Sequence, residues 1–235
     1  LYDVLEVKVL KKFQFFQTGI KFNNHKEDNL CVKAYNLIKT KYDIDPVYIH
    51  LHKNIPIGAG LGGGSSDSAN TIKALNDLFK LNISNNELKF LSKKLGSDCP
   101  FFIDSTPKYC TGRGEIMQNS NIDLSGFYIK LIYPSLHIST QKAYSLIKKY
   151  ALPQTFFNLN KMRISDWRNN LINSFEIPLF KKYPELKKIK ENLYNEGAFY
   201  ASMSGSGSSI FGLFKIKPSY SSQLPDTHFQ MIKKI

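Results

Sequence analysis

Residues 56–66 read Pro56-Ile57-Gly58-Ala59-Gly60-Leu61-Gly62-Gly63-Gly64-Ser65-Ser66, and this glycine loop decides how the rest of the chain is interpreted. It follows a strand-like run at 47–52 and opens a helical pattern at 66–79. Glycine at five of the seven positions 58–64 lets the backbone turn tightly and approach a ligand without interference from Cβ atoms. The first N–H groups of a helix lack partners within it and favour phosphate, as does the helix dipole. The loop therefore predicts a phosphate-binding site.

Two other phosphate-binding folds use glycine loops, and neither fits. A Walker A loop requires Lys and then Ser or Thr directly after its last glycine, whereas two serines follow here. Gly58, Gly60 and Gly63 satisfy G-x-G-x-x-G, but a dinucleotide site also needs an acidic residue about twenty positions later. Residues 81–84 contain none, and the next carboxylate is Glu87. A hairpin without a ligand is disfavoured, because a capped amphipathic helix follows directly.

Strand and helix patterns follow one another irregularly along the chain, which is typical of an α+β fold. Ser84 and Glu87 form a capping box that opens one of the helices. The segment 152–160 has no clear period and divides the chain into an N-terminal lobe, 1–152, and a C-terminal lobe, 153–235. The predicted strands are 4–10, 47–52, 127–133, 199–203 and 209–214, and the predicted helices are 66–79, the segment after Ser84, 141–150 and 184–196.

Asp98 lies in a second informative segment, Gly96-Ser97-Asp98-Cys99-Pro100-Phe101-Phe102. This segment follows a capped helix, and its apolar end predicts a strand. The proline restricts the residue before it, which would hold the carboxylate rigidly in the turn. On its own, the segment is slightly better interpreted as an Asx turn. Beside a phosphate loop, the carboxylate becomes a candidate to accept a proton from an attacking hydroxyl group.

The third segment, Ser202-Met203-Ser204-Gly205-Ser206-Gly207-Ser208-Ser209, joins two apolar strands. Taken alone, it is a hairpin turn. Together the three segments resemble motifs of the GHMP kinases, the superfamily of galactokinase, homoserine kinase and mevalonate kinase. The triple glycine before Ser65-Ser66-Asp67 is similar to the family of 4-diphosphocytidyl-2-C-methyl-D-erythritol kinases. Asn173 and Glu176 resemble that family's Asn-Asp-Leu-Glu-Pro segment.

The resemblance implies a two-lobed α+β kinase. Its N-terminal, ATP-binding lobe has a ribosomal-protein-S5-like topology that lacks its first strands, and its C-terminal lobe is an α/β substrate lobe. The implied reaction is the ATP-dependent phosphorylation of the 2-hydroxyl of 4-diphosphocytidyl-2-C-methyl-D-erythritol in non-mevalonate isoprenoid precursor biosynthesis. Asp98 is the implied catalytic base. Implied ATP-binding residues are Pro56, Ile57, Gly58, Ala59, Gly60, Leu61, Gly62, Gly63, Gly64, Ser65 and Ser66, and Gly205, Ser206 and Gly207 shape the substrate pocket.

The resemblance also implies Mg²⁺ as a cofactor. Ser65, Ser66 and Asp67 are near enough to the phosphates, but no metal-ligand spacing selects one of them, so we assign no metal ligand. One family motif, Lys-x-Asn followed by Gly-Tyr-His, is missing before Leu1, and Lys8 does not supply it. The alternatives are therefore another GHMP small-molecule kinase, of homoserine or mevalonate type, or an inactive nucleotide-binding fragment.

Composition narrows the choice of partners. The 235 residues carry a formal net charge of +13, but the basic residues are almost all Lys and are scattered along the chain. Nucleic-acid readers depend on Arg for bidentate contacts, so we expect no nucleic-acid partner. Three cysteines without C-x-x-C spacing predict a reducing compartment and no structural zinc. No apolar stretch predicts a membrane span, so we expect a cytoplasmic protein, or a plastid protein in a plastid-bearing host.

Overall fold

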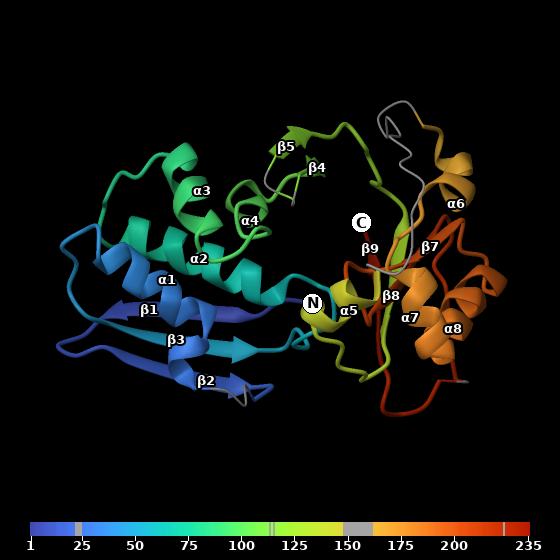
Figure 1. Cartoon of the computed structure of the whole chain (residues 1–235), viewed down its shortest axis with the longest axis horizontal. Coiled ribbons are helices and arrows are strands. Elements are labelled where there is room, and N and C mark those ends of the chain that lie inside the picture. The colour runs from blue at the N-terminus through green and yellow to red at the C-terminus, as the bar shows by residue number, and fades with distance from the viewer. Residues whose placement is uncertain (22–24, 113, 115, 148–161, 223) are drawn as a thin grey trace. The chain divides into compact units, whose positions relative to one another are not determined.

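The computed structural model describes residues 1–21, 25–112, 114, 116–147, 162–222 and 224–235 (Figure 1). Their contacts divide the chain into two compact units. Unit 1 contains Leu1–Ile57 and Gly62–Ser120, and unit 2 contains Gly58–Leu61 and Asn121–Ile235. The first residues of the glycine loop are thus counted with the second unit and its last residues with the first.

Unit 1 is built on a three-stranded sheet with the order β1-β3-β2. The strands are β1 (Val4–Val9), β2 (Gln14–Gly19) and β3 (Val47–Lys53). The central strand β3 pairs antiparallel with β1 and parallel with β2. Its side chains alternate between buried and half-buried, as expected for a strand with one face toward a core.

Helices cover the buried face of this sheet (Figure 1). Asn29 Oδ1 accepts the Cys31 N–H and caps α1, and Ser84 Oγ accepts the Glu87 N–H at 3.4 Å and caps α3, which confirms Ser84 as the helix start. The elements of this layer are η1 (Lys26–Asp28), α1 (Leu30–Lys39), α2 (Gly63–Leu78), α3 (Asn85–Lys93) and α4 (Phe101–Asp104), followed by a hairpin of β4 (Lys108–Thr111) and β5 (Ile116–Asn119).

Unit 2 contains a four-stranded sheet with the order β7-β8-β6-β9, in which every neighbouring pair is antiparallel. Helix α8 packs against β7 and β8, and Leu186, Ile189 and Leu193 supply its buried stripe. The strands are β6 (Tyr128–Tyr133), β7 (Tyr200–Met203), β8 (Ile210–Phe214) and β9 (Phe229–Lys234), and the helices are α5 (Thr140–Ile147), η3 (Ile164–Asp166), α6 (Trp167–Asn170), α7 (Glu176–Lys182) and α8 (Pro184–Asn195).

The structure contains the strands and helices that the sequence predicted, with small shifts at their ends. Two predictions differ from it. The apolar segment after Pro100 is the short helix α4 instead of a strand. The lobe boundary at 152/153 lies outside the described residues, and the contacts place residues 121–147 with the C-terminal unit, because β6 pairs with β8 and β9. None of the helices in the described ranges has the length and apolar character that a membrane span requires.

A buried lysine holds the unit 2 sheet to its neighbours. Lys130 of β6 is fully buried, and its Nζ pairs with Glu196 Oε2 at 2.6 Å and donates to the Ser219 carbonyl at 2.8 Å. We expect Glu196→Ala to lower the free energy of unfolding by about 3 kcal/mol, because it leaves a buried charge without its counterion. Urea denaturation checks this value.

Glu191→Ala is the matched control on the same helix. Glu191 pairs with Lys187 at 3.6 Å, and both side chains are more than half exposed. Such a surface pair contributes at most about 1 kcal/mol. Equal losses for the two variants would contradict a special role for Lys130.

Candidate functional site

The first part of the glycine loop packs against the 202–209 turn within unit 2. Ser204 Oγ donates to the Gly60 carbonyl at 2.7 Å, and the Ser209 N–H donates to the Ala59 carbonyl at 3.1 Å. Gly60 has a φ of +74°, and a Cβ there would lie 2.8 Å from the Gly207 carbonyl oxygen and against the Ser204 carbonyl. Only glycine fits this close approach of two backbones.

The last part of the loop opens helix α2 within unit 1. Gly62 is the N-cap residue with a φ of +68°, and it provides no side-chain cap. The helix begins at Gly63, three residues earlier than the sequence predicted, and its first turn contains no acidic residue. The first N–H groups of α2 therefore have no capping side chain and no nearby carboxylate in that turn, which suits an anion.

The loop residues differ in exposure. Pro56, Ile57, Gly58, Gly60, Leu61, Gly62, Ser65 and Ser66 are half-buried, Ala59 and Gly63 are buried, and Gly64 is exposed. This pattern leaves the loop partly open to solvent.

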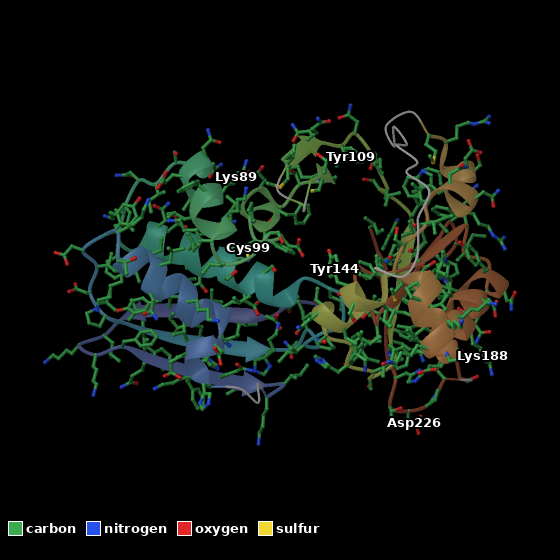
Figure 2. The ribbon with its side chains drawn as sticks, in the orientation of Figure 1. Lys89, Cys99, Tyr109, Tyr144, Lys188 and Asp226 are labelled. Atoms are coloured by element: carbon green, nitrogen blue, oxygen red, sulfur yellow. The ribbon has the colours of Figure 1, made fainter. Side chains whose placement is uncertain are left out.

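Asp98 lies in the turn between α3 and α4 and is exposed, whereas the next two residues are buried. The Sγ atom of Cys99 (labelled in Figure 2) shares a hydrogen bond of 3.3 Å with Ser68 Oγ of α2. The Cys99 N–H donates to the Gly96 carbonyl at 3.2 Å and closes the turn. Asp98 is thus attached, through its neighbour, to the helix that the glycine loop opens. Its role as a catalytic base stays a prediction.

Gly205, Ser206 and Gly207 form the tip of the 202–209 turn. Gly205 and Gly207 have positive φ values, and Ser206 Oγ is 3.4 Å from Thr140 Oγ1 at the start of α5. A Cβ on Gly205 would lie 3.2 Å from the Gly60 carbonyl oxygen. The structure therefore brings this tip to the first part of the loop.

Asn173 and Glu176 support the same turn. Asn173 Nδ2 donates to the Met203 and Gly205 carbonyls, both at 2.8 Å. Glu176 is 5% exposed, and its Oε1 accepts the Met203 N–H at 2.8 Å while its Oε2 pairs with Lys190 at 2.5 Å. The two residues that resembled a family motif therefore hold the backbone of the turn.

We expect Asn173→Ala to lower the free energy of unfolding by about 2 kcal/mol, because two carbonyl groups lose their shared donor. Asn170→Ala serves as the control, since it removes one local hydrogen bond, to the Asp166 carbonyl. Urea denaturation of both variants measures the difference. An Asn173→Ala loss no larger than that of the control would contradict the bracing role.

The sequence did not identify a buried ion cluster beside the loop. Lys53 pairs with Asp3 and Asp67, and all three side chains are less than a tenth exposed. A signal was present, because Lys53 continues the inward-facing alternation of Val47, Ile49 and Leu51. The pairing also bears on magnesium, because the Asp67 carboxylate is occupied by Lys53 instead of facing a ligand. Among the described residues, no group of three His, Cys, Asp or Glu side chains could hold a metal ion.

Comparisons with known proteins identify the class. The family model described as "GHMP kinases N terminal domain" matches residues 29–105, and "GHMP kinases C terminal" matches residues 158–221. The mevalonate kinase of Methanococcus jannaschii shares the fold, with a TM-score of 0.66 and 14% identity over 90% of this chain and 80% of that one. The chain belongs to the GHMP kinases. The family and the two-lobed α+β fold predicted from the motifs are confirmed.

The most similar relatives point to a particular member of this family. The chain is 44% identical to the 4-diphosphocytidyl-2-C-methyl-D-erythritol kinase of Cytophaga hutchinsonii, covering 92% of this chain and 80% of the relative. It is 42% identical to the enzyme of the same name from Parabacteroides distasonis, covering 93% and 80%. A crystal structure of 4-(cytidine 5'-diphospho)-2C-methyl-D-erythritol kinase matches with a TM-score of 0.73 and 30% identity, over 90% of this chain and 76% of that one.

Proposed function

We propose that the protein transfers the γ-phosphoryl group of ATP to the 2-hydroxyl of 4-diphosphocytidyl-2-C-methyl-D-erythritol. The observation that carries this choice of substrate is the 44% identity, over 92% of the chain, to a kinase named for that compound. The uncapped first turn of α2 supports the phosphate-binding half of the proposal. The reaction belongs to non-mevalonate isoprenoid precursor biosynthesis.

In this proposal, residues Pro56–Ser66 hold ATP, with its phosphates at the first N–H groups of α2. Phosphoryl transfer depends on positioning and on offsetting charge, with little covalent chemistry for the protein to perform. Asp98 accepts or orients the proton of the attacking hydroxyl group. Gly205, Ser206 and Gly207 shape the substrate pocket. The substrate is a small molecule, and we propose neither a nucleic-acid nor a membrane partner.

Mg²⁺ belongs to the proposal as the cofactor that offsets charge on the phosphate oxygens. Magnesium in kinases keeps several waters and is bound largely by the substrate phosphates, so a dedicated cage of side chains is not required. The burial of Asp67 against Lys53 argues against that carboxylate as a ligand. We assign magnesium no protein ligand.

A substrate panel tests the proposal. ADP release is measured with ATP, Mg²⁺ and, in turn, 4-diphosphocytidyl-2-C-methyl-D-erythritol, homoserine and mevalonate. We expect kcat/KM for the first compound to exceed the others by about 10²-fold or more, because a site that pairs the substrate's polar groups rejects analogues that lack them. Preferred turnover of homoserine or mevalonate would contradict the substrate. Binding of a non-hydrolysable ATP analogue without turnover of any of the three would favour the inactive fragment.

A further inference from the structure

The buried cluster beside the loop contains two carboxylates and one ammonium group. Lys53, the last residue of β3, is 5% exposed, and its Nζ pairs with Asp3 and, at 3.0 Å, with Asp67. With all three groups ionised, the cluster carries one positive and two negative charges, a net charge of −1. Buried charges are costly, so a cluster retained here needs a function beyond stability.

The cluster contacts both ends of the unit 1 backbone that flanks the loop. Asp3 Oδ1 accepts the N–H groups of Asn54 at 2.6 Å and Ile55 at 2.8 Å, directly before the loop begins. At the other end, a Cβ on Gly63 would lie 2.8 Å from Lys53 Nζ. The ammonium group therefore lies against the first residue of α2. Asp67, four residues further along the same helix, holds that ammonium group from below.

The protonation states of the two carboxylates differ. Burial raises the pKa of Asp67 to about 6, although Lys53 opposes the rise. Burial also acts on Asp3, but hydrogen bonds from Ile55, Lys53 and Asn54 hold the pKa of Asp3 below its ordinary value. Asp3 is therefore ionised throughout the neutral range, whereas Asp67 changes charge near pH 6. The cluster is neutral below that pH and negative above it.

Other groups near Asp67 do not change this result. Cys31 of α1 interacts with Asp67, but burial raises the pKa of its thiol to about 12, so it stays neutral. On the other helices beside α2, Lys89 of α3 (labelled in Figure 2) pairs with Asp104 of α4 at 2.7 Å. Asp3, Lys53 and Asp67 therefore set the local charge.

We propose that the Asp3–Lys53–Asp67 cluster positions the first turn of α2 for nucleotide phosphates, with Lys53 as the positioning residue and the charge of Asp67 tuning phosphate affinity. The inference rests on the proposed function in one respect, that the loop binds a nucleotide. Ionised Asp67 opposes the bound anion. Phosphate affinity therefore falls as the pH rises through about 6.

Asp67→Asn is the first test, because it keeps the shape of the side chain and removes its negative charge. Calorimetry measures the affinity for a non-hydrolysable ATP analogue at pH 5 and pH 8. At pH 8 we expect the variant to bind about threefold to tenfold more tightly than the unmodified protein. At pH 5, where Asp67 is itself largely protonated, we expect affinities within about twofold of each other.

The ratio of the two proteins at each pH cancels the titration of the nucleotide. Asp104→Asn is the matched control, an aspartate of the same unit paired with Lys89 and Lys108, and we expect it to leave the affinity unchanged at both pH values. The same ratio at pH 5 and pH 8 for Asp67→Asn, or weaker binding by this variant at pH 8, would overturn the role of Asp67.

Lys53→Met is the second test, and it leaves the two carboxylates without their cation. We expect the folded variant to bind the analogue about tenfold more weakly at pH 8. Lys130→Met, which alters a buried lysine of unit 2, is expected to leave the affinity unchanged even if it lowers stability. A folded Lys53→Met protein with unchanged affinity would overturn the positioning role. If this variant does not fold, Asp67→Asn decides the question.

These measurements use the nucleotide alone. A protein that binds the analogue but does not phosphorylate 4-diphosphocytidyl-2-C-methyl-D-erythritol would contradict the proposed substrate and leave the cluster's role intact. An unmodified protein that fails to bind the analogue would contradict the proposed function. Normal binding with unaltered ratios would contradict only the role of the cluster.

Discussion

Asp98→Asn is expected to lower kcat about 10²–10⁴-fold, the usual contribution of a positioned general base. The amide cannot accept the proton of the attacking hydroxyl group, whereas the glycine loop is unchanged, so KM for ATP should stay within about twofold. Because Asp98 is exposed, the free energy of unfolding should change by less than about 0.5 kcal/mol. ADP release with 4-diphosphocytidyl-2-C-methyl-D-erythritol measures the effect.

Asp104→Asn controls for the loss of a carboxylate in the same segment. Asp104 ends α4 and pairs with Lys89 at 2.7 Å and Lys108 at 3.0 Å. It has no part in the proposed chemistry, so its variant should retain the unmodified kcat. Turnover by Asp98→Asn at the unmodified rate would remove Asp98 from the mechanism.

Gly60→Ala is expected to weaken binding of the ATP analogue by about tenfold or more. The new Cβ would meet the Gly207 and Ser204 carbonyls, and because both obstacles are backbone, the loop or the turn must move. Displacements of about 1 Å in positioning groups cost up to about 10²-fold in rate. The left-handed φ of +74° adds about 1–2 kcal/mol of strain. Calorimetry and urea denaturation measure the two effects.

Gly197→Ala separates strain from collision. Gly197 also has a positive φ, of +97°, but a Cβ there would meet nothing within 4 Å. We expect this variant to lose about 1–2 kcal/mol of stability and to bind the analogue normally. Equal affinities for the two variants would show that the contact between loop and turn does not matter for the nucleotide.

Local signals were sufficient to predict most of the elements near the site. The alternation of β3 and the cap at Ser84 appear within a few residues of sequence, and both are confirmed. The segment after Pro100 was misjudged because two adjacent phenylalanines favour a strand. There, Pro100 itself adopts helical dihedral angles, with a φ of −60° and a ψ of −29°, and α4 begins directly after it.

Pairings between distant residues could not be predicted in the same way. β6 joins the second sheet because its partners β8 and β9 come about eighty or more residues later, and no local pattern indicates this. The cluster of Asp3, Lys53 and Asp67 likewise assembles from three separate segments. The glycine loop was identifiable because its constraint is local, whereas its supporting charges are visible only in the folded chain.

The position of the transferred phosphate tests the central claim most directly. The 2-carbon of 4-diphosphocytidyl-2-C-methyl-D-erythritol bears a methyl group and a hydroxyl group, and therefore no hydrogen. Phosphorus NMR of the product made with ATP and Mg²⁺ should show a new phosphomonoester without three-bond coupling to any proton, and ADP in equal amount. A phosphomonoester coupled to a carbon-bound proton, or no transfer at all, would contradict the account.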